Sequence, residues 1–142
     1  DTFRWKGENV ATTEVENVLH AVPGIAEVTV YGVAVPNYDG RVGMAAMILE
    51  EGKTAENMDW SAYHKECTKN LASYSRPAFL RVQEAISVTA TFKHQKSILV
   101  KDGFDPDVIK KDKLFFYSQK DGSITPLDSE LFRKVATGEV KI

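Results

Sequence analysis

Two short stretches of the sequence carry side chains whose types and spacing could do chemistry. The first, Asp1 to Glu16, contains Gly7, and glycine lets a backbone approach a ligand where any Cβ would obstruct it. The second, Thr89 to Lys96, holds Lys93 and Lys96, whose ammonium groups could neutralise a phosphate or a carboxylate. The residues alone leave a plainer alternative open, in which Gly7 makes a tight turn and both lysines are solvated surface charges.

Other combinations of reactive side chains are weaker. His64 and Cys67 stand three residues apart on an expected helix, but no second pair completes a tetrahedral site. Core packing is therefore the favoured interpretation, and no metal site is predicted. His20 and His94 have no nucleophile arrangement beside them, and the sequence holds no Gly-x-x-x-x-Gly-Lys phosphate loop, Gly-x-Ser-x-Gly elbow or Cys-x-x-Cys pair.

The first stretch is expected to form a short strand, the Gly7 loop and then a helix. Phe3 and Trp5 alternate with polar residues, which is typical of a strand, and Thr13 and Glu16 have capping-box spacing at the helix start. Four apolar positions follow on one helical face, at Val15, Val18, Leu19 and Val22. Pro23-Gly24 should end this helix.

The next part of the chain predicts a sheet with helices packed against it. Two β-branched runs, Val28 to Val35 and Met44 to Leu49, indicate a hairpin, and nearly every residue in them is apolar, so both faces should be covered. A helix capped by Asp59 follows, with a stripe at Trp60, Tyr63, Cys67 and Leu71, and then a strand from Ala78 to Gln83. This order predicts an α+β fold, a small two-layer α/β sandwich.

The remaining residues predict a loop, a short helix and a tail. The loop runs from Ser87 to Phe92 and the helix from Lys93 to Lys101. The tail should form a hairpin around Lys120-Asp-Gly122 and a last helix capped by Asp128, with apolar residues at Leu131, Phe132 and Val135. Phe115, Phe116 and Tyr117 are consecutive, so at least one ring should leave the local core. They form either an aromatic cluster within the tail or a docking surface.

Composition limits the classes of function. The chain has 142 residues, 43% of them hydrophobic, and a net charge of -2, which suits one globular domain and supplies no general attraction to nucleic acid or anionic lipid. Its single cysteine cannot form an intrachain disulfide. No signal peptide is recognised, and no apolar run approaches the roughly 20 residues that span a bilayer.

The opening residues Asp-Thr-Phe-Arg-Trp-Lys-Gly-Glu-Asn-Val, followed by Thr-Thr-Glu-Val, resemble the signature of the fatty acid transport protein and very-long-chain acyl-CoA synthetase family, within the adenylate-forming superfamily. The resemblance implies a C-terminal lid cut from a larger enzyme, because the chain starts at Asp1 without methionine. Asp1 would lie beside the hinge. Gly7, Glu8 and Asn9 would line the tunnel for the pantetheine arm of coenzyme A after the lid rotates.

The stretch Thr89-Ala-Thr-Phe-Lys-His-Gln-Lys96 is similar to the family loop Thr-Gly-Thr-Phe-Lys. The resemblance implies that Lys93 is catalytic, contacting the fatty acid carboxylate and the ATP α-phosphate during adenylation, with Lys96 in support. One residue departs from the family pattern, because Ala90 replaces its glycine. If that position needs a positive φ, alanine would be strained by on the order of 1 kcal/mol.

The resemblance covers the whole chain and implies a lid domain over residues 1–110 and a family-specific C-terminal extension over residues 111–142. It implies a ligase that converts fatty acid, ATP and coenzyme A into acyl-CoA, AMP and pyrophosphate through an acyl-adenylate. ATP, coenzyme A and Mg²⁺ would be bound mainly by the missing N-terminal AMP-binding domain, this chain's expected partner, so the fragment alone should be inactive. We expect the enzyme on the cytoplasmic face of the endoplasmic reticulum, peroxisome or plasma membrane, attached through the missing part, where thioester formation could also promote fatty acid uptake.

An alternative from another class is a non-catalytic module that binds RNA or protein, because the order of elements is also ferredoxin-like. Arg76, Arg81, Lys93 and Lys96 could then line a basic face. The aromatic pattern of RNA-recognition strands is missing from the sequence, and the hairpin strands should be covered, so nucleic acid is not the expected partner.

Overall fold

The computed structural model describes residues 1–84 and 92–142, with the side chains of residues 92–95 outside the description. The chain forms seven strands, four α-helices and one short 3₁₀-helix in these residues. In order they are β1 (Thr2–Trp5), β2 (Glu8–Ala11), α1 (Thr12–Leu19), β3 (Ile25–Val33), β4 (Val42–Leu49), α2 (Trp60–Asn70), the 3₁₀-helix (Ser73–Ser75), β5 (Phe79–Gln83), α3 (Phe92–Asp102), β6 (Lys113–Tyr117), β7 (Ile124–Pro126) and α4 (Ser129–Ala136). No helix among the described residues is both long and apolar enough to cross a membrane.

A five-stranded sheet forms the centre of the molecule, with strand order β3-β4-β5-β6-β7. β3 and β4 form the predicted antiparallel hairpin. β5 runs parallel to β4, which the chain achieves by crossing over through α2. β6 and β7 add antiparallel strands at the far edge, and β1 and β2 form a separate two-stranded sheet.

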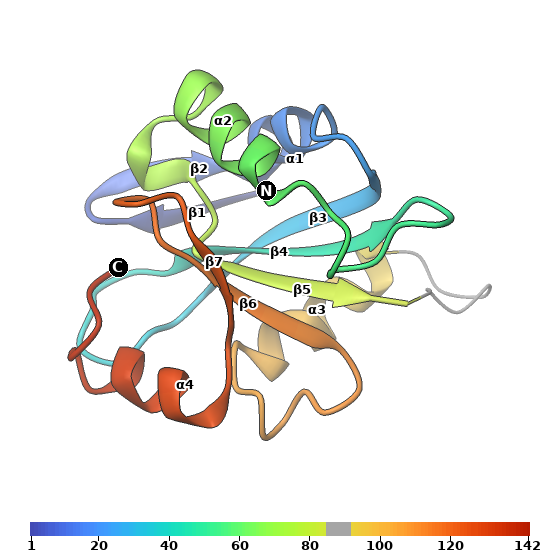
Figure 1. Cartoon of the computed structure of the whole chain (residues 1–142). Coiled ribbons are helices and arrows are strands. Elements are labelled where there is room, and N and C mark those ends of the chain that lie inside the picture. The colour runs from blue at the N-terminus through green and yellow to red at the C-terminus, as the bar shows by residue number, and fades with distance from the viewer. Residues whose placement is uncertain (85–91) are drawn as a thin grey trace.

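Helices cover both faces of the five-stranded sheet. Figure 1 shows α1 and α2 on one side and α3 and α4 on the other. Alternate residues of β3 serve two separate cores, because Val28 and Val30 pack with α1 and α2, whereas Tyr31 and Val33 pack on the opposite face. The α+β fold and the covered strands predicted from sequence are therefore confirmed, but the molecule has three layers rather than the predicted two, because α3 and α4 cover the second face of the sheet.

The N-terminal segment differs from the predicted strand, loop and helix. Glu8–Ala11 forms a second strand, β2, paired with β1, so the segment is a hairpin that runs directly into α1. The predicted capping box is wrong, because the helix begins at Thr12 and the residue before it makes no side-chain cap. The Glu16 carboxylate instead accepts hydrogen bonds from Val30 N at 2.8 Å and Thr29 Oγ1 at 3.2 Å. β3 is an edge strand, and its backbone N–H needs such an acceptor.

The predicted tail elements are confirmed. Asp128 accepts a hydrogen bond from Leu131 N at 2.8 Å and so caps α4. Phe116 packs into the core beside α4, whereas Phe115 and Tyr117 belong to the core under α2, so alternation along β6 divides the three rings between two covered faces. β6 pairs with β5, which joins the predicted extension to the main sheet. The boundary at residue 110 stays a prediction.

Candidate functional site

The Gly7 turn connects β1 and β2 with only two residues, Lys6 and Gly7. Both have positive φ, 52° and 81°, which is the backbone of a type I′ hairpin turn. The Arg4 guanidinium donates to the Gly7 carbonyl at 2.7 Å and to Asn9 Oδ1 at 3.3 Å. Glu8 and Asn9 lie in β2 rather than in a loop, and both are exposed together with Gly7. The predicted trio therefore forms the solvent-facing tip of a rigid hairpin.

This hairpin is fixed to the body of the domain at its base. Trp5 is buried, and its ring centroid lies 5.1 Å from that of Tyr38 in the β3–β4 connection. Arg41 N donates to the Arg4 carbonyl at 2.7 Å, and Trp5 forms an isolated bridge with Gly40. The tip is thus held in place relative to the five-stranded sheet.

The second stretch is only partly described. Residues 85–91, which include Thr89 and Ala90 of the predicted loop, lie outside the described residues. Lys93 belongs to the first turn of α3, but its side chain lies outside the description. The position of its ammonium group, and the effect of Ala90, stay predictions.

Lys96 and Asp1 meet although they are far apart in sequence. Lys96 Nζ lies 2.7 Å from Asp1 Oδ2, so the residue predicted beside the hinge forms an ion pair with α3. Burial lowers the pKa of Lys96, and the carboxylate of Glu16 opposes this change. Asp1 and Lys96 line a cavity of about 350 Å³ together with Arg41 and other residues.

A buried ionic network lies at the other end of α3. Arg81 on β5 is 6% exposed, and its Nε and Nη1 donate to Asp112 Oδ2 at 2.7 Å and Asp102 Oδ2 at 3.0 Å. Burial lowers the pKa of Arg81, but the hydrogen bonds to Asp112 and Asp102 outweigh burial and leave the pKa raised. The guanidinium therefore stays charged and holds the last residue of α3 against the sheet.

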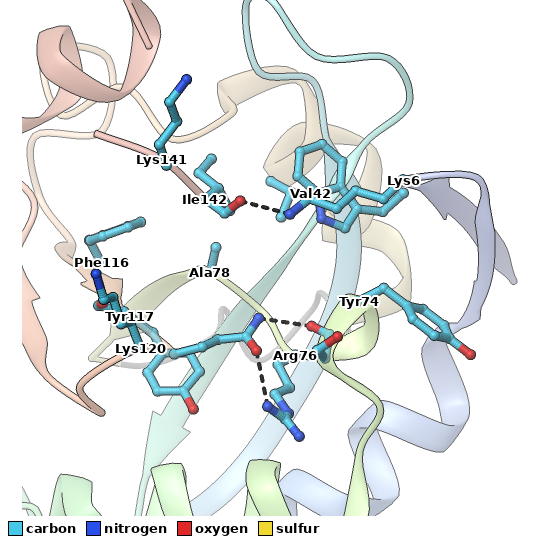
Figure 2. A pocket seen from close by; sticks show the side chains of 14 residues that line it. Lys6, Val42, Tyr74, Arg76, Ala78, Phe116, Tyr117, Lys120, Lys141 and Ile142 are labelled. Atoms are coloured by element: carbon cyan, nitrogen blue, oxygen red, sulfur yellow. Dashed lines mark hydrogen bonds between the residues drawn. The ribbon is translucent and has the colours of Figure 1, made fainter. Parts of the chain in front are cut away.

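A second cavity, of about 330 Å³, lies next to the Gly7 turn and is shown in Figure 2. Four cationic residues from distant parts of the chain line it, and no acidic side chain does: Lys6, Arg76, Lys120 and Lys141. The apolar part of its lining includes Trp5, Val42, Ala78 and Phe116. Lys6 reaches across to the Ile142 carbonyl at 2.8 Å. The two cavities share no lining residue.

Arg76 is the most firmly held cation of this cavity. Its Nε donates to the Cys67 and Leu71 carbonyls, each at 3.0 Å, and its Nη1 donates to Gln119 Oε1 at 3.0 Å. Gln119 Nε2 in turn donates to the Ser73 carbonyl at 2.8 Å. No local pattern relates the four cations, because successive members of the set are 70, 44 and 21 residues apart in the sequence. The only local indication was Arg76 before Pro77, which reports backbone shape rather than charge.

The basic face of the RNA-binding alternative does not form in the described residues. Arg81 is buried in ion pairs, Arg76 bonds backbone carbonyls, and Lys96 pairs with Asp1. The sheet also lacks an open face for base stacking, because helices cover both sides (Figure 1).

His64 and Cys67 have structural surroundings. His64 Nδ1 shares a 2.7 Å hydrogen bond with the Tyr117 hydroxyl, and Cys67 is fully buried, which raises the pKa of its thiol to about 12. Among the side chains of residues 1–84 and 96–142, no three His, Cys, Asp or Glu residues are grouped so that they could hold a metal ion.

Comparison with known proteins gives one consistent result. The family model described as AMP-binding enzyme C-terminal domain matches residues 14–93. Long-chain fatty acid transport protein 2 of Rattus norvegicus is 42% identical over 144 residues, which is 100% of this chain and 22% of the relative. Long-chain fatty acid transport protein 1 of Bos taurus is 46% identical over 138 residues, 97% of this chain and 21% of the relative. The chain thus spans about a fifth of the length of these curated relatives.

Among solved structures, the Mycobacterium tuberculosis fatty acyl CoA synthetase matches with a TM-score of 0.56 and 28% sequence identity. The match covers 71% of this chain and 19% of that chain. The likeness therefore extends to a synthetase of known structure.

Proposed function

From the premise that this chain belongs to the family of AMP-binding enzyme C-terminal domains, we propose that it is the lid of an ATP-dependent long- or very-long-chain fatty acid–CoA ligase. Its relatives are named long-chain fatty acid transport proteins, and a synthetase acting on fatty acyl groups shares its fold. The match of the family model is the observation that carries the proposal. Thioester formation would trap a lipid as a polar conjugate, so the transport in those names needs no pore.

The proposed reaction has two halves. A fatty acid carboxylate attacks the ATP α-phosphate and releases pyrophosphate, and the coenzyme A thiol then attacks the acyl-adenylate carbonyl and releases AMP. The large N-terminal domain would bind the acyl chain, ATP and Mg²⁺, and would attach the enzyme to the cytoplasmic face of a membrane. The lid would serve each half-reaction in a different orientation, so the chain alone would be inactive.

Lys93 would serve the first half-reaction. Attack of a carboxylate on a phosphate brings two anions together, and a compact ammonium on a flexible stem stabilises the charge that spreads over the phosphoryl oxygens. α3 supplies a folded support for this lysine, and the Lys96–Asp1 ion pair connects that support to the segment beside the proposed hinge. Lys96 would therefore support the reaction by steadying α3.

The Gly7 turn and the cationic cavity beside it would serve the second half-reaction. A pantetheine arm needs an unobstructed path, and a Cβ on Gly7 would meet nothing within 4 Å in the isolated lid, so the tip is free to face another domain. The nucleotide end of coenzyme A carries several phosphates. The cavity suits such a group, because Lys120 and Lys141 line it and its lining holds no acidic side chain, whereas Lys6 and Arg76 already donate to carbonyl oxygens.

The test is fatty-acid-dependent ATP–pyrophosphate exchange by the full-length enzyme, which reports adenylation alone. Lys93→Ala should lower its rate about a hundred- to a thousand-fold, the usual effect of removing one preorganised charge-stabilising donor. Lys101→Ala is the matched control, because it removes the same charge from the last turn of the same helix and should retain normal exchange. Normal exchange by Lys93→Ala, or an equal loss in both variants, would contradict the assignment.

A further inference from the structure

Arg81 is a buried cation shared by two carboxylates that are distant in sequence. It lies on β5, the middle strand of the five-stranded sheet, and is 6% exposed. Its two bonded partners are Asp102, the last residue of α3, and Asp112, which comes directly before β6. One guanidinium thus ties the end of a helix and the start of the next strand to the centre of the sheet.

α3 has few other anchors among its described side chains, residues 96–102. Leu99 is buried at 1% exposure and Val100 packs partly buried against the same core, whereas Ile98 is 59% exposed. The second ion pair of the helix, Lys96–Asp1, is open to solvent because the Asp1 side chain is 61% exposed. The bond between Arg81 and Asp102, whose side chains are 8% and 25% exposed, is therefore the less exposed of the two ion pairs, and it fixes where α3 ends against the sheet.

The orientation of α3 matters most at its other end. Lys93 precedes Asp102 by nine residues, which is about 14 Å along a helix that rises 1.5 Å per residue. If the helix pivoted about its C-terminal end, a tilt of about 5° would move its first turn by about 1 Å. A misplacement of about 1 Å can lower a reaction rate about a hundredfold.

The charge balance of this network also favours a positioning role. Buried ion pairs seldom add net stability, because desolvation offsets their attraction. Here two carboxylates share one guanidinium, which stabilises the fold less than two complete pairs would. Hydrogen bonds to a planar guanidinium are directional, however. The network should therefore define the orientation of α3 more strongly than it stabilises the fold.

We infer that the Arg81–Asp102 ion pair is a positioning device that holds α3 in the orientation required for adenylation, whereas Asp112 ties the start of β6 to the same guanidinium. The inference rests on the proposed function, in which α3 carries the adenylating lysine. Arg81 and Asp102 act through the helix and are positioning residues.

The experiment compares Asp102→Asn with Asp112→Asn in the full-length enzyme. Each variant removes one negative charge from the same guanidinium, but only the first frees α3. Asp102→Asn should lower kcat of ATP–pyrophosphate exchange about tenfold with KM values unchanged, and should leave thioester formation from supplied acyl-adenylate at its normal rate. Asp112→Asn should change both half-reactions by the same factor and lower the thermal midpoint.

Amide hydrogen exchange supplies a readout that does not depend on activity. Backbone amides of α3 should exchange faster in Asp102→Asn than in the parent enzyme or in Asp112→Asn. If Asp102→Asn fails to fold, Asp102→Glu replaces it, because this variant keeps the charge and displaces the carboxylate by one methylene. It should lower the rate of ATP–pyrophosphate exchange selectively, but by a smaller factor than Asp102→Asn.

The inference is overturned if Asp102→Asn retains normal pyrophosphate exchange, if Asp112→Asn shows the same selective loss, or if α3 amides exchange no faster without the carboxylate. Failure of the proposed function is a separate outcome, because it shows as normal pyrophosphate exchange by Lys93→Ala. The amide measurement on α3 then still decides whether the ion pair holds the helix.

Discussion

α2 and α3 are both 11 residues long, yet their described side chains make different kinds of contact with the rest of the fold. α2 begins at a side-chain cap, in which Asp59 accepts from Ser61 N, and it buries Tyr63 and Cys67 completely. Among the described side chains of α3, Leu99 alone is buried to a similar degree.

The two ends of the described part of α3 are tied by charge instead. Lys96 pairs with Asp1, and Asp102 pairs with Arg81. Apolar burial favours packing of a helix against the sheet but is non-directional. Hydrogen-bonded ion pairs are directional, so they also define the orientation of the helix. The difference indicates that α2 belongs to the scaffold, and it supports the proposal that α3 orients Lys93.

Of the changes that test the contrast between α2 and α3, Tyr63→Ala should have the largest effect on the free energy of unfolding. The ring is fully buried and its hydroxyl donates to the Pro77 carbonyl at 3.0 Å, so its removal should lower the free energy of unfolding by about 3 to 5 kcal/mol. Urea denaturation of the 142-residue chain measures this loss. Tyr63→Phe is the control, because it keeps the ring and should lose only about 1 to 2 kcal/mol. A loss below about 1 kcal/mol in Tyr63→Ala would show that α2 is not part of the scaffold core.

The next effect is the loss of stability at high pH, and the groups responsible lie mainly in the core under α2. Burial raises the pKa of the Cys67 thiol from 9.0 to about 12 and that of Tyr117 from 10.0 to about 12, and it also raises the pKa of Tyr63. Tyr31 on the opposite face contributes with the same sign, because burial raises its pKa too.

The unfolded chain therefore releases these protons at lower pH than the folded one. This stabilisation is fully present below about pH 9 and is lost as pH rises toward about 12. Denaturation midpoints measured at intervals over this range should fall steadily. Cys67→Ala should show a shallower decline, and an unchanged slope in that variant would contradict the contribution of the thiol.

The smallest effect is expected from Lys96→Ala, which breaks the exposed ion pair with Asp1. Such pairs contribute about 0 to 1 kcal/mol, so the urea midpoint should move little. Amide exchange in α3 should increase while that in α2 stays unchanged. Equal increases in amide exchange in α2 and α3 would contradict the view that charge contacts hold α3 and apolar burial holds α2.

Most of the scaffold could be predicted from sequence because its elements follow local rules. The β3–β4 hairpin shows dense β-branched apolar residues, and Asp59 and Asp128 both act as the predicted helix caps. β2 was missed because Glu8 and Asn9 are polar and exposed on a two-stranded sheet, so no apolar alternation marks the strand.

The candidate site was less accessible to sequence analysis, because its contacts join distant residues. Nothing local relates Asp1 to Lys96, or Arg81 to Asp102, and the four cations of the cavity beside Gly7 come together only after the sheet and tail have formed. The residues that a motif identifies can be found in sequence, whereas those that position them depend on the tertiary fold.

The most direct test of the account is to measure both half-reactions in the full-length enzyme carrying Lys93→Ala or Gly7→Val. Gly52→Val is the matched control for backbone strain, because Gly52 and Gly7 have φ of 86° and 81° and a Cβ on either meets nothing within 4 Å. We expect Lys93→Ala to lose adenylation and keep thioester formation from supplied acyl-adenylate, Gly7→Val to do the reverse, and Gly52→Val to retain both. If Lys93→Ala and Gly7→Val each reduce the two half-reactions by the same factor, the division of labour between α3 and the hairpin tip is wrong.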